Sequence, residues 1–161
     1  GRPVHDDGKL FEMLLLECFQ AGLSWECMLN KREGFRRVFA DFHLEKVCAF
    51  TAMDVERLMQ DDAIIRHRRK IEAAINNARI FRKMAQEYGS FAQYLWQWME
   101  GKVIYDCVNT TSPLSDALSK DLKKRGMKFV GSTTIQSYLQ AAGLINAHQP
   151  DCFLYAQDTK K

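Results

Sequence analysis

The sequence predicts an all-α protein built around one hydrophobic core. Apolar residues recur at helical spacing through most of the 161 residues, only three prolines interrupt them, and alternating β-branched residues are scarce. Hydrophobic residues make up 47% and charged residues 27% of the chain, which is ordinary globular usage and excludes disordered, collagen-like and disulfide-framework proteins. The length is that of one domain, so we expect a single domain over residues 1–161.

The N-terminal half contains a run of short predicted helices. The first carries apolar residues on almost every side from Leu10 to Cys18 and ends at Gly22, so we expect it to be buried. Ser24 is a suitable N-cap for a second helix that extends to about Lys31. Three further helices are predicted over Glu33–Phe39, Leu44–Phe50 and Asp54–Met59, the last begun by the turn Thr51-x-x-Asp54.

The C-terminal half is predicted to begin with a long helix over His67–Tyr88, which Gly89 ends. Ser90 then caps a helix that includes Trp98. The segment Gly101–Thr111 is the least regular and predicts an exposed loop. Pro113 begins a helix that ends at Gly126, and a last helix is predicted over Thr133–Ala142. In the helix after Pro113 the predicted buried residues are Leu114, Ala117, Leu118 and Leu122, and the predicted outward-facing residues are Lys120, Lys123, Lys124 and Arg125.

Charge is divided unevenly along the chain. The net charge is −4 over residues 1–65 and +7 over residues 66–161, against +3 for the whole. A basic second half indicates a positive face for a polyanion, although a solvated helix surface would carry the same charges.

The cysteines and the apolar segments indicate in which cellular compartment the protein is located. Five cysteines without a Cys-x-x-Cys pair, and no visible secretory signal, favour free thiols in a reducing environment. No apolar run approaches the roughly 20 residues that span a bilayer. We therefore expect a cytoplasmic protein without membrane contact.

The segment between the last two helices predicts a phosphate contact. Gly126–Gly131 is a short hairpin with Lys128 in it, and Ser132, Thr133 and Thr134 begin the next helix. Gly131 allows a close backbone approach, and a helix N-terminus presents unpaired N–H groups to an anion. A helix–hairpin–helix binds DNA phosphates in this way without reading sequence; the alternative is an ordinary αα-hairpin.

A second feature is the carboxylate of the first helix. Glu17 lies among apolar residues, and burial without a partner would raise its pKa. With Trp25 nearby, it could form a pocket for a planar, electron-poor heterocycle. The alternative is that Glu17 faces solvent or pairs with an arginine.

Two weaker features complete the survey. His148 and Cys152 are zinc-ligand types at a workable spacing, but a structural zinc requires four ligands. The basic run Arg66–Lys70 heads the long helix, where positive charge opposes the dipole, so we expect it to have acidic partners.

Several stretches together resemble the bacterial DNA-3-methyladenine glycosylase I family. Leu16–Trp25 reads LECFQAGLSW, and Ile64–Arg68 is followed by Lys70 and Ile71. Leu118–Gly131 is the third stretch, and Gln140–Asn146 leads into His148-x-x-x-Cys152. These stretches occur in order over nearly the whole chain, which makes the resemblance specific.

The resemblance implies a helix–hairpin–helix DNA glycosylase-like helical bundle that lacks the family's N-terminal leader of about twenty residues. It also implies base-excision repair, with removal of 3-methyladenine from alkylated DNA. By position, Glu17 matches the catalytic residue that accepts hydrogen bonds from the flipped base, and Trp25 matches the aromatic wall. Gln20 and Ser24 lie in the same base-binding segment.

The remaining site residues follow from the same resemblance. The DNA-binding hairpin comprises Lys128, Gly131, Ser132, Thr133 and Thr134. His148 and Cys152 match two of the four ligands of a zinc site whose other ligands belong to the leader. Zinc is thus implied only as a half-site, and the chemistry requires no cofactor.

The implied reaction is hydrolysis of the N-glycosidic bond. A base methylated at N3 is cationic and leaves easily, so the enzyme has to flip it out of the duplex and bind it more tightly as the bond breaks. No lysine stands at an obvious nucleophilic position in the hairpin region, which predicts a monofunctional hydrolase without strand cleavage. We expect it to act as a monomer on double-stranded DNA and to release free 3-methyladenine. The alternatives are a non-catalytic helix–hairpin–helix DNA-binding module and a glycosylase retuned to bulkier alkyl adducts.

Overall fold

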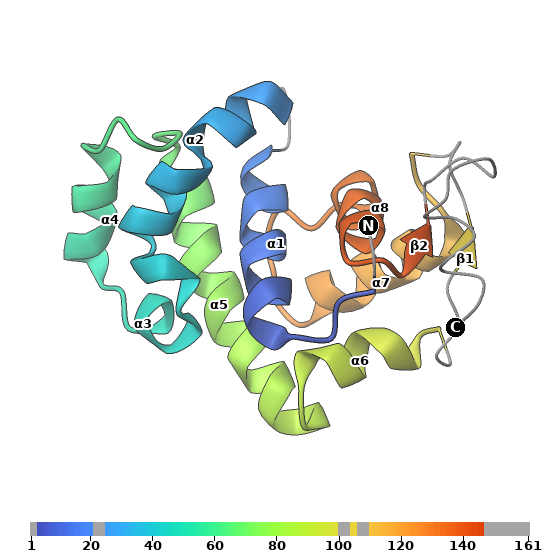
Figure 1. Cartoon of the computed structure of the whole chain (residues 1–161). Coiled ribbons are helices and arrows are strands. Elements are labelled where there is room, and N and C mark those ends of the chain that lie inside the picture. The colour runs from blue at the N-terminus through green and yellow to red at the C-terminus, as the bar shows by residue number, and fades with distance from the viewer. Residues whose placement is uncertain (1–2, 21–24, 100–103, 106–109, 147–161) are drawn as a thin grey trace.

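The computed structural model describes residues 3–20, 25–99, 104–105 and 110–146, and these residues form the predicted helical protein (Figure 1). The helices are α1 (Asp7–Gln20), α2 (Trp25–Val38), the 3-10 helix η1 (Ala40–Phe42), α3 (Leu44–Cys48), α4 (Ala52–Met59), α5 (Arg68–Tyr88), α6 (Phe91–Gln97), α7 (Pro113–Lys124) and α8 (Ser132–Ala141).

The extended structure among the described residues is one pair of two-residue strands. Strand β1 (Ile104–Tyr105) pairs in parallel with β2 (Ile145–Asn146). Strand β1 lies within the segment Gly101–Thr111, for which the sequence predicted a loop throughout. Two residues are too few to show an alternating pattern, so this pairing had no local signal.

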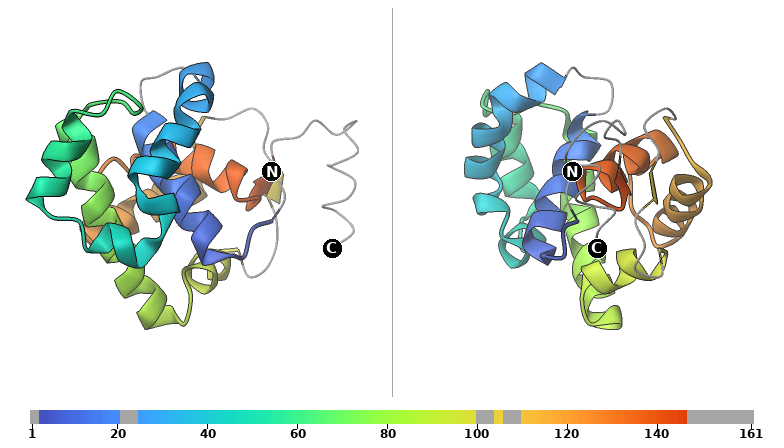
Figure 2. Two further views of the ribbon diagram at one scale, coloured as in Figure 1. Left: turned by 60° about the vertical axis from the view of Figure 1, so that its left-hand side comes forward. Right: turned by 45° about the vertical axis from the view of Figure 1, so that its right-hand side comes forward.

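Helix α1 lies in the middle of the molecule (Figures 1 and 2). It contacts α2 and α5 on one side and α8 on the other, and α7 packs against α8. The hydroxyl of Tyr138 on α8 donates to the Leu10 carbonyl at 2.9 Å. The all-round apolar surface of α1 therefore corresponds to burial on several sides, as predicted, with Leu10 and Phe19 fully enclosed.

Helix α2 corrects one prediction. The sequence predicted separate helices to about Lys31 and over Glu33–Phe39, but α2 continues through Gly34 to Val38. A glycine inside a helix costs about 1 kcal/mol relative to alanine. Here it allows close packing, since a Cβ at position 34 would lie 2.3 Å from the Ala63 carbonyl oxygen. Close packing thus accounts for the glycine, and the break predicted between Lys31 and Glu33 is absent.

Capping residues stabilise the N-termini of several helices. Thr51 and Asp54 form the expected capping box at α4, and Ser112 caps α7 directly before Pro113. At α6 the predicted cap Ser90 accepts from the backbone N–H of Gln93 at 3.0 Å. These bonds satisfy N–H groups that a helix leaves unpaired at its start.

The burial pattern of α7 differs from the prediction at two residues. Leu118 and Leu122 are buried, but Ala117 is exposed. Arg125 does not point freely outward, because its guanidinium binds Asp121 at 2.9 Å and the Tyr88 hydroxyl at 2.6 Å. It thereby ties the end of α7 to α5.

Two of the described cysteines, Cys18 and Cys48, are free thiols, as expected. Cys18 and Cys48 are buried in helices and Cys27 is half-buried, whereas Cys107 and Cys152 lie outside the described residues. Within the described part, no helix combines the length and the hydropathy needed to cross a membrane. The cytoplasmic location stays a prediction.

Candidate functional site

A cavity of about 140 Å³ opens beside the C-terminal half of α1. Its walls come from three helices that are far apart in the sequence, and the described residues lining it are Met13, Leu16 and Glu17 of α1, Met28, Leu29 and Arg32 of α2, and Ala141 of α8. The lining is apolar except for Glu17 and Arg32. This composition suits a flat, largely apolar ligand that presents few polar groups.

Glu17 is the acidic residue of this cavity. It is 9% exposed, and burial raises its pKa from 4.5 to about 7. No hydrogen bond or ion pair joins it to another described residue. The cavity's cation is already paired, because Arg32 binds Glu12 at 3.1 Å. The structure therefore agrees with the interpretation in which Glu17 is buried, and not with the one in which it faces solvent or pairs with an arginine of the described residues.

The other predicted base-binding residues follow Glu17 along the chain. Gln20 is half-buried at the end of α1, three residues after Glu17 and so on the same side of the helix. Trp25 begins α2, but its side chain lies outside the described part of the structure, as does Ser24. Their contacts with a base stay predictions.

Lys70 holds the end of the helix that carries Glu17. Its ammonium group donates to the Phe19 carbonyl at 3.0 Å and lies 5.9 Å from the centre of the Phe129 ring. The Phe19 carbonyl is one of the last four of α1, which have no partner within the helix. Burial lowers the pKa of Lys70. One side chain thus joins the cavity-lining helix to the hairpin before α8.

The hairpin itself is fixed on α5 through side-chain amides. The side-chain amide of Asn77 pairs with the backbone of Lys128 as a neighbouring β-strand would. It donates to the Lys128 carbonyl at 2.8 Å and accepts from the Lys128 N–H at 2.9 Å. Asn76 donates to the Gly126 carbonyl at 2.9 Å. These bonds hold Phe129 in a left-handed conformation with φ of 57°, which is unusual for a bulky residue.

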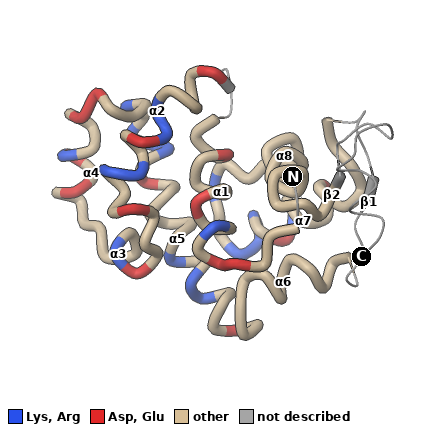
Figure 3. Tube along the Cα trace, viewed as in Figure 1, with Lys and Arg blue, Asp and Glu red and all other residues tan. Residues whose placement is uncertain are grey.

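The start of α8 has the properties of an anion site. Its N-cap is Gly131, which supplies no side-chain cap. Gly131 has an ordinary φ of −61°, and a Cβ there would meet nothing within 4 Å among the described atoms. Neither conformation nor neighbours require glycine here, so the residue keeps space open in front of the helix. Helix α8 also carries no charged residue (Figure 3).

The side chains around this helix start divide into two groups. Ser132 is engaged within the protein, since its hydroxyl bonds to Ser115 at 2.8 Å and also to Asp116. Thr133 and Lys128 are exposed, and Thr134 is half-buried. The structure therefore brings the predicted hairpin residues to one surface, with Thr133 and Lys128 free to reach solvent.

No metal site is formed by the described residues, because no group of three or more His, Cys, Asp or Glu side chains lies together there. His148 and Cys152 fall outside the described ranges. The described side chains thus offer nothing that fits a zinc ion.

The sequence analysis missed two residues that shape the site, Asn77 and Lys70. Both are polar positions within the apolar stripe of α5, and both are buried. Because buried polar groups need partners, a polar residue at a core position could have been flagged as making a specific tertiary bond. Its partner could not be named from the sequence.

Comparison with known proteins gives a consistent result. A family model described as methyladenine glycosylase matches residues 1–155. DNA-3-methyladenine glycosylase 1 of Escherichia coli (strain K12) is 47% identical, with 96% of this chain and 86% of that protein covered. The DNA-3-methyladenine glycosylase of Haemophilus influenzae (strain ATCC 51907 / DSM 11121 / KW20 / Rd) is 40% identical, with 94% and 85% covered.

Solved structures agree with the sequence relatives. A variant of 3-methyladenine DNA glycosylase I in complex with 3-methyladenine superposes with a TM-score of 0.91 at 43% identity, with 95% of this chain and 86% of that chain covered. The 3-methyladenine DNA glycosylase I of Staphylococcus aureus has a TM-score of 0.90 at 43% identity, with 95% and 85% covered. The match extends over the fold that carries the cavity.

Proposed function

The chain belongs to the methyladenine glycosylase family, and we propose that this DNA-3-methyladenine glycosylase hydrolyses the N-glycosidic bond after flipping the base into the cavity beside Glu17. The observation that carries the proposal is the buried carboxyl group of Glu17, which has no partner among the described residues and lies in a cavity whose one other charged lining residue there, Arg32, is paired with Glu12. A fold retains an uncompensated group of this kind at a cost, and functional sites are where such costs occur.

Glu17 recognises the base by accepting hydrogen bonds from its amino edge. The ionised carboxylate also attracts the positive charge of a base methylated at N3, in an apolar environment that strengthens the attraction. Trp25 stacks on the other side of the base and adds a cation–π contribution of about 1–2 kcal/mol.

The reaction needs no acid from the protein. The base leaves with the electron pair of the glycosidic bond and becomes neutral 3-methyladenine. Water adds its oxygen to C1′ of the deoxyribose and releases one proton to solvent. The protein supplies orientation and tighter binding as the bond breaks.

We expect a monofunctional enzyme. Strand cleavage by a glycosylase of the lysine type would need an amine in the cavity, and no lysine is among the described residues that line it. The buried Lys70 instead donates to the Phe19 carbonyl. Water therefore remains the nucleophile, and the abasic strand stays intact.

The partner is double-stranded DNA that carries alkylated bases, bound by a monomer. Thr133, Lys128 and the free N–H groups before α8 contact the phosphate backbone without reading sequence. Zinc enters the proposal only as a structural group at His148 and Cys152, and no step above passes through a metal.

The test measures free 3-methyladenine released from methylated duplex DNA. We expect the wild type to release it and Glu17→Gln to lose at least 10-fold in rate, about 1.4 kcal/mol or more of transition-state binding. Glu33→Gln is the matched control, because the Glu33 side chain is 86% exposed on the solvent side of α2. Its rate should equal the wild type's.

The outcomes separate the alternatives. DNA binding without release of any base would favour a non-catalytic binding module. Release of larger alkyl bases in preference to 3-methyladenine would favour a retuned glycosylase. Equal rates for wild type and Glu17→Gln would refute the role assigned to Glu17.

A further inference from the structure

Two arginines of the described part differ from the others in their interactions. Arg66 and Arg69 have no hydrogen-bond or ion-pair partner among the described residues. The other described arginines bind carboxylates or carbonyl oxygens: Arg32, Arg36, Arg37, Arg57, Arg68, Arg79, Arg82 and Arg125. Among the arginines of the basic run Arg66–Lys70, Arg68 has the predicted acidic partner within the described residues, Glu56.

The position of Arg69 is unfavourable for the isolated fold. It lies in the first turn of α5, which carries no acidic residue. The N-terminus of a helix has a partial positive charge, so a cation there is repelled. The Arg69 guanidinium is exposed and has no partner among the described residues, so it is available to an anion outside the chain.

Arg69 faces the hairpin. A hollow of about 270 Å³ is lined by Arg69, Glu72, Ala73 and Asn76 of α5 and by Lys128 and Phe129 of the hairpin. His67, the N-cap of α5, also contacts the hairpin, since its ring meets the Phe129 ring edge to face at 6.1 Å between centroids. Arg69 and Lys128 therefore bring their charges to one surface from two elements.

We propose that Arg69 forms a second phosphate-binding point for DNA, continuous with the hairpin. The proposal rests on the proposed function, which places the DNA backbone at Lys128 and Thr133. A guanidinium binds a phosphate through two parallel N–H donors. Glu72 lines the same hollow and opposes the phosphate, so it weakens this contact.

The test uses three variants of α5 and undamaged duplex DNA. Each phosphate contact contributes about 0.9 to the slope of log K against log salt. Arg69→Gln should reduce that slope by about 0.9 and weaken binding several-fold at low salt. Glu72→Gln should tighten binding, because it removes the opposing charge.

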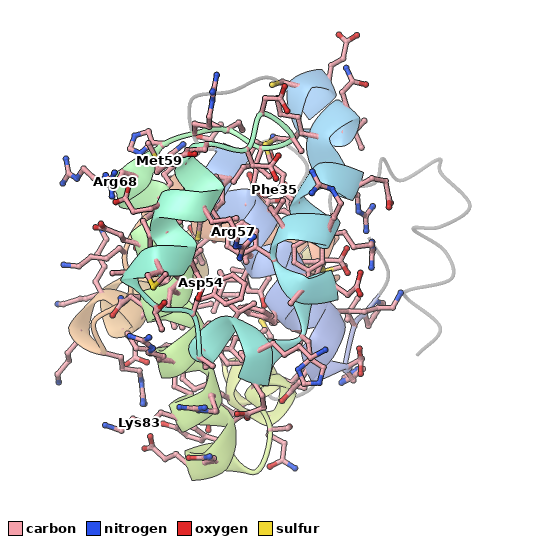
Figure 4. All side chains as sticks on the ribbon, turned by 90° about the vertical axis from the view of Figure 1, so that its left-hand side faces the viewer. Phe35, Asp54, Arg57, Met59, Arg68 and Lys83 are labelled. Carbon is pink, nitrogen blue, oxygen red and sulfur yellow. The ribbon has the colours of Figure 1, made fainter. Side chains whose placement is uncertain are left out.

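Lys83→Gln is the matched control on the same helix. Position 83 lies 14 residues beyond Arg69, about 21 Å along the axis. Figure 4 shows Lys83 and Arg68, the neighbour of Arg69, toward opposite ends of α5. The control should bind DNA as the wild type does.

The readouts separate this proposal from the proposed function. With enzyme in large excess over methylated DNA, Arg69→Gln should release 3-methyladenine at the wild-type single-turnover rate, while its half-saturating concentration rises. Thermal unfolding verifies that the variant is folded. If Arg69→Gln keeps the wild-type affinity and salt slope, or if Lys83→Gln loses as much, the second phosphate point is refuted, whether or not the chain releases the base.

Discussion

Replacing Glu17 with glutamine removes the only buried acidic residue of the described structure. The unfolded chain titrates this group at 4.5, whereas burial raises the pKa in the folded protein to about 7. Between these values the folded protein holds a proton that the unfolded chain has lost. The stabilising contribution is therefore complete below pH 4.5 and is lost as pH rises to about 7.

The size of the effect follows from the shift. One pKa unit corresponds to 1.36 kcal/mol, so raising pH across this window costs the wild type about 3 kcal/mol of unfolding free energy. Glutamine does not titrate. The stability of Glu17→Gln relative to the wild type should therefore increase by about 3 kcal/mol between pH 4.5 and pH 7.5.

Urea unfolding at a series of pH values measures this difference. All other titrating groups are shared, so they cancel in the comparison. Glu33→Gln is the control for the substitution itself, because the Glu33 side chain is 86% exposed. If the stability difference between Glu17→Gln and the wild type stays constant across the series, Glu17 titrates as an ordinary surface carboxylate and the buried-acceptor argument fails.

The same group sets a pH dependence of activity. A cationic base is bound by the ionised carboxylate, so kcat/KM for release of 3-methyladenine should rise with pH through about 7. A profile that is flat between pH 6 and 8 would show that the charge of Glu17 is not used.

Three further changes test the hairpin and the core. Gly131→Ala should leave the unfolding free energy within about 0.5 kcal/mol of the wild type, because a Cβ at this position meets nothing and φ is −61°. The same change should weaken DNA binding. Unchanged affinity in a filter-binding or fluorescence assay would argue against a phosphate at this point. Asn77→Ala removes both hydrogen bonds to the Lys128 backbone and should lower the unfolding free energy measured in urea by about 2–3 kcal/mol. A loss below about 0.5 kcal/mol would show that the hairpin does not depend on these bonds. Gly34→Ala places a Cβ 2.3 Å from the Ala63 carbonyl oxygen and should lower the unfolding free energy by about 1–3 kcal/mol. An increase in stability, as expected at an unhindered helix position, would mean that the Ala63 backbone moves away without cost.

Much of the helical framework could be predicted from the sequence because its signals are local. Apolar periodicity indicated α1 and α5, and the capping residues Thr51 and Ser90 stand at the starts of α4 and α6. Such signals act within one or two turns of a helix, so they do not depend on the rest of the chain. They place helix boundaries less well, since α2 runs unbroken from Trp25 to Val38 across the break predicted between Lys31 and Glu33.

The candidate site was only partly accessible from the sequence. A carboxylate in an apolar helix drew attention to Glu17, and the residues around Gly131 indicated the phosphate contact. The sequence left open whether Glu17 meets solvent, an arginine or a cavity. Only the tertiary structure decided this, because the cavity walls come from α2 and from Ala141 on α8. The same holds for Asn77, whose partner Lys128 is 51 residues away, and for Arg69, which lines a hollow together with Lys128 of the hairpin. Spacing along a chain determines which residues share a helix face, whereas the groups that meet that face depend on how the helices pack in three dimensions.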